Sequence, residues 1–475
     1  MASSARQRSA SFFGAQGPCV LLLLATIALT VIGLVMVYSA SSASLAGAGE
    51  VPWADVRSQA IYAVLGVVAM VAVWKFIPYH VWNGVWTWAA WGVALVLLAL
   101  TALMGSEGYG ATRWLSLGPI SLQPSEIAKV AFLLMSIRVI CDVRSGSMEP
   151  RAMLVQILLL ILAPLLFLYW SQSDLGTTLI CAVGIVAVLW LGGVPAKYLA
   201  ALCVLGVLFV LYAIFGSDYR SGRMVFLDPW NDGQDGYGTG YNIIRSYYAI
   251  AEGGLFGVGV GQGHERFDYL FASDSDFIFA IVCEELGMLG ALVVIALFLV
   301  ILFAGLRIAN GAPDEFGALI AGGFAIMLVF QAFLNIGCTI GVFPTTGKPL
   351  PFISSGGTSL LVSFSMVGLI LSVAEAAGAP SVYEQRRADL RVVRASGANG
   401  DPARPASRAQ GRSGARGGSS RSRSRTRRFE ADAFARPLVP SRAAVAPAHA
   451  GAARPSARPS SSHAGRRFAP SGARR

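Results

Sequence analysis

The stretch from Gly253 to Gly290, GGLFGVGVGQGHERFDYLFASDSDFIFAIVCEELGMLG, begins as a glycine-rich polar loop and runs directly into a long apolar segment. Four acidic side chains precede the apolar part: Glu265, Asp268, Asp274 and Asp276. Carboxylates at the mouth of a membrane helix cost free energy unless they are solvated or paired. The stretch therefore predicts a membrane helix with a functional site at its polar end.

The composition of the whole chain indicates a polytopic membrane protein. Of its 475 residues, 55% are hydrophobic and 13% are charged, and the mean hydropathy is +0.60. The six cysteines lie in or beside apolar runs, without the spacing of a metal site. The four histidines are scattered along the chain, which argues against a histidine-based zinc centre.

The apolar runs predict an all-α fold of about ten transmembrane helices, each near the roughly 20 residues that a bilayer helix needs. We expect them at 19–37, 58–77, 81–103, 125–142, 152–170, 175–193, 197–216, 277–305, 316–341 and 359–378. The loops on the side of the N-terminus then carry Lys75, Arg144, Arg151, Lys197 and Arg307. Because short cytoplasmic loops are enriched in Lys and Arg, both termini are expected on the cytoplasmic side of the membrane.

The chain divides into three parts by composition. Residues 1–18 form a short cytoplasmic leader, and residues 19–380 form the membrane domain. Within that domain, residues 217–276 form a large extracytoplasmic loop between helices 7 and 8, and long loops are usually functional. Residues 381–475 contain 21 Arg and five acidic residues and few large apolar ones, which predicts a disordered cytoplasmic tail. An anionic lipid or an acidic partner, and no nucleic acid, is expected to bind it.

Several polar residues lie near the outer ends of the predicted helices. Glu126 and Lys129 are three residues apart, so they share a helix face and can form an ion pair. One interpretation is that the pair only holds helices together. The other is that Arg113 and Lys129 present positive charge to an anionic ligand, with Trp114 as an interfacial anchor.

Asp174 precedes a predicted helix, where it can cap the helix and complement its dipole. In the large loop, Arg220 and Arg223 have a spacing that suits a phosphate or diphosphate, although a solvated loop face has the same pattern. Within the predicted helices, Gln331 and Asn335 lie one turn apart and are expected to make interhelical hydrogen bonds. Glu284 and Glu285 are expected to face protein in the same way.

The connector PTTGKPLPFISSGGTSLL, residues 344–361, carries Lys348 and a Ser-Ser-Gly-Gly turn that includes Ser355. Backbone N–H groups near a helix start suit an anion, and a connector without a ligand is the alternative. The glycines between Gly253 and Gly263 are not a dinucleotide fingerprint, because no strand precedes them. They are expected to let backbone approach backbone or a ligand closely.

Taken in order, six motifs resemble the SEDS family of bacterial cell-wall proteins, which includes FtsW, RodA and SpoVE. The resemblance covers about residues 20–378, and the motifs are GATRWLSLGPISLQPSE, SDLGT, FLDPW, GGLFGVGVGQG, SDFIFAIVCEELG and NIGCTIGVFPTTGKPLPFISSGG. It implies a ten-helix fold and a peptidoglycan glycosyltransferase that polymerises lipid II at the outer face of the membrane. A class B penicillin-binding transpeptidase and division or elongation proteins are the implied partners.

The resemblance also implies roles for individual residues. Asp276 corresponds to the essential carboxylate of the family, Lys129 to its lysine after the QPSE segment, and Asp268 to a supporting acid. The chain has Ala272 and Asp274 where the family commonly has Glu and His. It also departs from the usual family pattern at Asn242 and Arg245.

These assignments lead to a mechanism in which Asp276 is the general base and cationic residues stabilise the departing diphosphate. The metal requirement is left open, with Mg²⁺ or Mn²⁺ as the candidate divalent cation. The long Arg-rich tail favours a division-type protein over an elongation-type one. Two other functions stay open, a lipid II flippase and a non-catalytic scaffold for a transpeptidase.

Overall fold

The structure is a computed structural model of the whole chain. It describes residues 2–108, 111–117, 120–146, 152, 155–215, 222–267 and 269–378. The predicted disordered tail, 381–475, lies outside the described residues. All the elements below belong to the compact unit Met1–Ala398.

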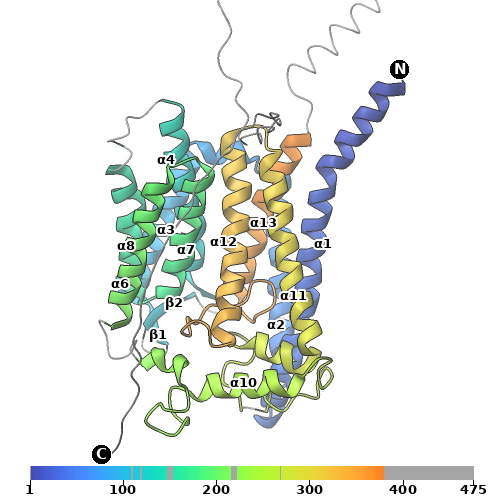
Figure 1. Cartoon of the computed structure of the whole chain (residues 1–475), viewed down its shortest axis with the longest axis vertical. Coiled ribbons are helices and arrows are strands. Elements are labelled where there is room, and N and C mark those ends of the chain that lie inside the picture. The colour runs from blue at the N-terminus through green and yellow to red at the C-terminus, as the bar shows by residue number, and fades with distance from the viewer. Residues whose placement is uncertain are drawn as a thin grey trace, which may run out of the picture. The chain divides into compact units, whose positions relative to one another are not determined.

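Long apolar helices dominate this unit, and Figure 1 shows them running side by side. Seven described helices are long and apolar enough to cross a membrane. They are α1 (Ala2–Gly47), α2 (Ala54–Phe76), α3 (Val85–Met104), α8 (Ala196–Phe215), α11 (Ile278–Asn310), α12 (Glu315–Thr339) and α13 (Gly357–Gly378). The prediction of a helical polytopic membrane protein is confirmed.

Other helical segments pack among these seven. They are α4 (Pro124–Arg144), η2 (Ile157–Leu162) continued by α6 (Ala163–Gln172), and α7 (Leu175–Leu191). Each overlaps one of the predicted spans, while the total of ten stays a prediction. The ends follow local sequence: Pro124 occupies the first turn of α4, and Asp314 caps α12 by accepting from the Gly317 N–H at 2.7 Å.

A small antiparallel sheet lies between α3 and α4, where the sequence predicted only a loop. Its strands are β1 (Ser106–Gly108), β2 (Ala111–Leu117) and β3 (Ile120–Leu122), in the order β1-β2-β3. Strands β1 and β3 have three residues each, and β2, ATRWLSL, does not alternate polar and apolar residues, so none gives a strand signal in the sequence. Three shorter helices complete the described elements: η1 (Tyr79–Asn83), η3 (Gly222–Leu227) and α10 (Tyr241–Gly253).

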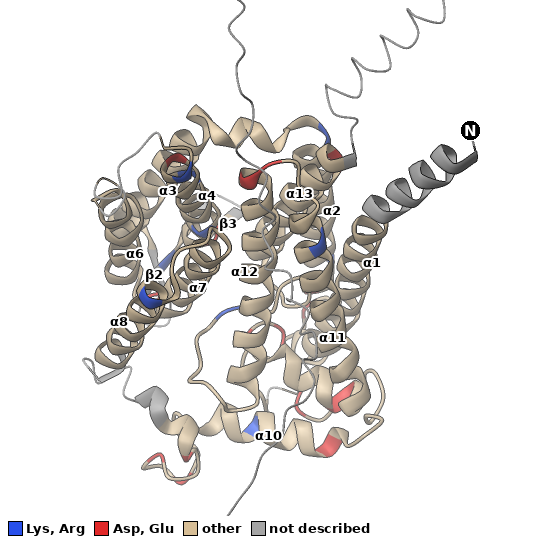
Figure 2. Ribbon diagram, turned by 45° about the horizontal axis from the view of Figure 1, so that its top comes forward, with Lys and Arg blue, Asp and Glu red and all other residues tan. Residues whose placement is uncertain are grey.

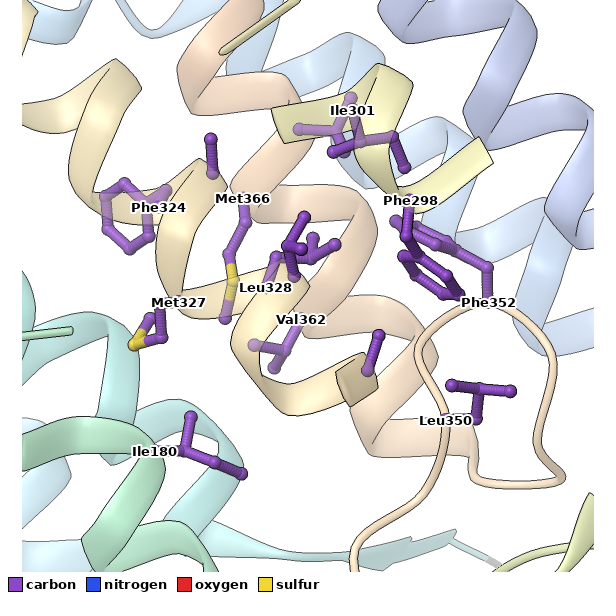
Figure 3. Close-up of a cluster of buried hydrophobic side chains, with 14 of the residues drawn as sticks. Ile180, Phe298, Ile301, Phe324, Met327, Leu328, Leu350, Phe352, Val362 and Met366 are labelled. Atoms are coloured by element: carbon purple, nitrogen blue, oxygen red, sulfur yellow. The ribbon is translucent and has the colours of Figure 1, made fainter. Parts of the chain in front are cut away.

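Helix α12 forms the centre of the bundle. It packs against α4, α7, α11 and α13, and 78% of its most apolar window is buried, against 6% for α8. Figure 3 shows the side chains that fill this centre, with Phe324 and Met327 of α12 near Met366 of α13. Helix α8 is therefore a peripheral helix whose apolar surface is available to lipid or a partner. Helix α12 is the central helix of the bundle, and the other helices pack around it.

Most of the acidic and basic residues that are coloured in Figure 2 lie toward the ends of the bundle. At one end, Lys75 of α2 pairs with Glu375 of α13 at 2.9 Å, and Arg144 of α4 pairs with Glu315 of α12 at 2.7 Å. The other end carries the sheet, α10 and the connector between α12 and α13. We call it the loop end.

A kink at Gly287 divides α11 near the loop end. Gly287 has φ 68° and ψ −172°, a conformation that disfavours residues with a Cβ. The backbone of the glycine-rich segment hydrogen-bonds the backbone of α11 just before this kink: the Val258 N–H donates to the Glu284 carbonyl at 3.0 Å. A side chain at Gly253 or Gly257 would collide with the carbonyl oxygens of this segment. The predicted close approach of backbone to backbone is confirmed.

Candidate functional site

The turn between α6 and α7 and the connector to α13 are held together by a buried ion pair. Lys348 Nζ lies 2.6 Å from Asp174 Oδ2, and both side chains are fully buried. Asp174 also caps α7 as predicted, accepting from the Thr177 N–H at 3.0 Å. Burial by itself raises the pKa of Asp174, but Lys348 and Arg113 outweigh it and lower the pKa to about 2. Asp174 is therefore ionised.

The predicted pair in α4 also forms and is buried. Lys129 Nζ lies 2.6 Å from Glu126 Oε2 and donates to Gln331 Oε1 at 2.7 Å. The Gln331 side chain in turn donates to the Pro349 carbonyl at 3.0 Å. The pair thus ties α4 to α12 and α12 to the connector. Buried charges without such partners would be costly.

Asn335 fixes the position of two segments at once. Its side-chain amide donates to the Asp276 carbonyl at 2.9 Å and to the Lys348 carbonyl at 2.8 Å. The predicted interhelical hydrogen bond is confirmed for Gln331, which bonds Lys129 of α4, whereas Asn335 bonds the turn before α11 and the connector instead of another helix. No local pattern indicated that Asn335 joins the acidic turn to the connector, since 59 residues separate it from Asp276.

Asp276 and Arg113 both lie close to Gly347. A methyl group placed at Gly347 would lie 3.7 Å from Asp276 Oδ2 and 3.7 Å from Arg113 Nη1. Asp276 Oδ2 and Arg113 Nη1 are therefore separated by no more than the sum of these two 3.7 Å distances. Arg113 is held by the turn before α7, donating to the Ser173 carbonyl at 3.1 Å. Asp276 is partly exposed, whereas Lys129 and Lys348 are buried.

Asp274 and Ser355 meet beside Asp276. The Ser355 N–H donates to the Asp274 carbonyl at 2.9 Å, and the Ser355 side chain also hydrogen-bonds the Asp274 carboxylate. Burial, with a smaller effect from Asp55, raises the pKa of Asp274. The turn begins at Ala272, whose φ of 57° is unfavourable for a residue with a Cβ. Such backbone conformations are common at functional sites.

The two departures from the family pattern in α10 support the same turn. Arg245 forms a two-pronged ion pair with Glu265, with both N···O distances at 2.8 Å. Asn242 Oδ1 accepts from the Phe271 N–H at 3.3 Å. Both substitutions therefore hold the 265–271 segment against α10, a role that the motif comparison did not predict.

Some predicted site residues stay untested. Arg220 and Asp268 lie outside the described residues, and the side chain of Arg223 is not described. Trp114 lies in β2, with 36% of its surface exposed, which suits an interfacial position.

Potential metal ligands also gather away from Asp276. Among the described residues, Glu252, His264 and Glu284 bring carboxylate oxygens and an imidazole nitrogen within 4.8 Å of one another. This group contains none of the residues predicted from the sequence as catalytic or substrate-binding.

The comparison with known proteins covers the same region as the described bundle. A family model for cell cycle proteins of the FtsW, RodA and SpoVE group matches residues 20–378. The chain belongs to the FtsW/RodA/SpoVE family. The resemblance inferred from the motifs is confirmed, and the match ends where α13 ends.

Members of the FtsW/RodA/SpoVE family align over most of their length. The probable peptidoglycan glycosyltransferase FtsW of Geobacter metallireducens is 36% identical over 354 residues, or 74% of this chain and 93% of that protein. Stage V sporulation protein E of Bacillus subtilis is 34% identical over 373 residues, covering 75% and 96%. Both therefore lack a counterpart to about a quarter of this chain.

Solved structures of the family have the same fold. A chain of a peptidoglycan synthase complex that coordinates polymerization and crosslinking is 27% identical, with a TM-score of 0.62 over 75% of this chain and 97% of that one. The rod shape determining protein RodA of Thermus thermophilus is 26% identical, with a TM-score of 0.54 over 74% and 95%.

Proposed function

We propose that the chain is a peptidoglycan glycosyltransferase of the FtsW type, which polymerises lipid II into glycan strands for septal wall synthesis. The family membership and the names of its relatives support the activity. The observation that carries the assignment of the site is that Asp276 and Arg113 both lie beside Gly347, each 3.7 Å from a Cβ placed there. A partly exposed carboxylate beside a fixed cation suits a reaction in which a proton is removed and an anion departs.

In this proposal Asp276 is the general base. It removes the proton from the 4-hydroxyl of the acceptor N-acetylglucosamine, and the resulting oxygen nucleophile attacks the anomeric carbon of the donor N-acetylmuramic acid. The new glycosidic bond forms with inversion as the bond to undecaprenyl diphosphate breaks. Base catalysis of this kind typically contributes about 10² to 10⁴ in rate.

The cations at the loop end take different roles. Arg113 is the best placed to stabilise the departing diphosphate, because it lies beside Gly347 and Asp276. Lys129 and Lys348 are already paired with Glu126 and Asp174, so we assign them to positioning the helices and the connector. Arg220, Arg223, Ser355 and Asp268 stay candidates for substrate binding and support.

The proposal places the loop end outside the cell and both termini in the cytoplasm. Lys75, Arg144 and Arg307 belong to the opposite end of the bundle, as expected for the cytoplasmic side. A class B penicillin-binding transpeptidase is the proposed partner. A relative in a complex that coordinates polymerization and crosslinking supports that pairing.

The test is Asp276→Asn in the full-length protein, purified with its transpeptidase and supplied with fluorescent lipid II. We expect polymerisation to fall by about 10² to 10⁴ because the general base is lost. The matched control is Asp235→Asn, the same change at an exposed loop carboxylate. Wild-type rates in a well-folded Asp276→Asn protein would refute the assignment.

The same reconstituted protein separates the competing functions. A flippase would move lipid II across the bilayer without making polymer, and a scaffold would do neither while still binding the transpeptidase. Division and elongation are distinguished by whether a fluorescent fusion gathers at the septum or along the side wall.

A further inference from the structure

A second polar cluster lies at the edge of the loop end, built from three separate segments. Glu252 lies near the end of α10, His264 follows the glycine-rich segment, and Glu284 lies in α11 before the kink. Glu252 Oε2 is 3.2 Å from His264 Nδ1, and ligand atoms of all three residues lie within 4.8 Å of one another. No two of the three are neighbours in sequence.

The carboxylate of Glu284 is the unusual member of this cluster. The residue is fully buried, and its Oε1 accepts from the backbone N–H groups of His264 and Glu265. Its Oε2 is also buried and has no hydrogen-bond partner among the described residues. A buried carboxylate oxygen without a partner is costly, so the position calls for a positively charged ligand.

We propose that Glu252, His264 and Glu284 bind a divalent transition-metal ion, with Zn²⁺ as the best match. Zn²⁺ takes imidazole nitrogen and carboxylate oxygen at about 2.0 to 2.2 Å, which puts tetrahedral ligands about 3.3 Å apart. The separation of Glu252 Oε2 and His264 Nδ1 fits that spacing. A set of one imidazole and two carboxylates also suits a transition ion better than Mg²⁺, which prefers oxygen ligands alone.

The surroundings leave the ion a way in and room to bind. Glu252 and His264 are exposed, so an ion can enter from solvent and keep water as a fourth ligand. A Cβ at residue 263 would lie 2.8 Å from Glu284 Oε2, and Gly263 leaves that space open. The scattered histidines argued against a histidine-based centre, but this site needs only one histidine because the fold supplies the two carboxylates.

The role of this ion is to stabilise the loop end by cross-linking three of its segments. It would join α10, the loop at His264 and the first part of α11, and Glu284 lies eight residues after Asp276 in that part. Glu252 and His264 are outside the proposed catalytic machinery. The site therefore stands independently of the glycosyltransferase assignment.

The test is titration of the purified full-length protein, carrying a tag without histidine, with Zn²⁺ followed by calorimetry and thermal unfolding. Wild type should bind one Zn²⁺ more tightly than Mg²⁺, and its Tm should rise with Zn²⁺ because the ion binds only the folded state. Glu252→Gln and His264→Gln should each weaken binding by about 100-fold or more, since losing even an outer-shell partner costs about 10- to 100-fold. Both residues are exposed, so these variants are expected to fold.

Two controls isolate the site. The tail variant His449→Gln/His463→Gln and the variant His80→Gln remove the other histidines and should leave the tight site intact. Asp276→Asn should lose polymerisation yet bind Zn²⁺ like wild type, which separates this site from the catalytic one. Equal Zn²⁺ affinity in wild type, Glu252→Gln and His264→Gln, or tight binding that disappears only with the tail histidines, would overturn the proposal.

Discussion

The buried ion pairs and the acidic turn lie at the same end of the bundle, but their charged groups differ in exposure to solvent. Lys348 and Asp174, like Lys129 and Glu126, are sealed from solvent and neutralise each other in pairs. Asp274 and Asp276 are carboxylates on a partly exposed turn that begins with a left-handed Ala272. Buried pairs set the geometry of the connector, whereas the Asp276 carboxylate is partly exposed and is the proposed general base.

The largest effect in this comparison is expected from Lys348→Met. Removing one partner of a buried pair leaves Asp174 uncompensated, which typically costs about 3–5 kcal/mol. Thermal or chemical unfolding of the purified protein measures that loss. Asp276→Asn is the contrast, because it should lower activity with little change in stability.

The double variant Lys348→Met/Asp174→Asn sharpens the result. Asparagine can still cap α7, and no buried charge is left unpaired, so most of the stability should return. If Lys348 only positions the connector, polymerisation should recover together with stability. A stable double variant that stays inactive would instead place Lys348 in contact with the substrate.

Asn335→Asp should have a smaller effect. The change replaces an amide that donates to the carbonyls of Asp276 and Lys348 with a carboxyl group, so two buried acceptors lose their donor. Such losses cost about 1–3 kcal/mol. We expect kcat for polymerisation to fall with KM nearly unchanged, because Asn335 is buried and would act through the position of Asp276.

Asn242→Asp is the matched control for that prediction. Asn242 uses its side-chain oxygen as an acceptor, and a carboxylate keeps that function. Equal losses of kcat in Asn242→Asp and Asn335→Asp would contradict a specific role of Asn335 in positioning Asp276.

The smallest effect is expected at Asp274. Its pKa is raised in the folded protein, chiefly by burial, so folding favours the protonated form. Its contribution to stability is therefore fully present below the ordinary pKa of 3.8 and is lost as the pH rises through the raised value. Asp274→Asn should accordingly stabilise the protein at neutral pH, with the gain vanishing in acid. Unfolding curves of wild type and Asp274→Asn, measured from acidic to neutral pH, test this prediction. A variant that is less stable than wild type at neutral pH would contradict it.

The local features of the chain were predictable because their causes are local. Apolar runs located the helices, the three-residue spacing of Glu126 and Lys129 predicted their pair, and the position of Asp174 predicted a helix cap. The motifs also predicted the family correctly. These patterns depend on neighbours within one or two helical turns.

The sheet at 106–122 was missed for a different reason. Strands β1 and β3 are too short to carry a periodic pattern, and the sequence of β2 does not alternate. Their pairing stabilises them only once α3 and α4 bring the segment back on itself. The departures at Asn242 and Arg245 were visible in the sequence, but their roles were not, because their partners Phe271 and Glu265 lie 29 and 20 residues away.

The sequence by itself determined the membrane-embedded helices and the family, and its resemblance to the family led to the proposal of Asp276, because hydrophobicity and motif spacing can be read along the chain. The tertiary structure alone decided which charges are neutralised and which stay accessible. It joined Lys348 to Asp174 across 174 residues, placed Arg113 beside Asp276 at Gly347, and gathered Glu252, His264 and Glu284. Burial and pairing depend on the packing of distant segments, which no local pattern encodes.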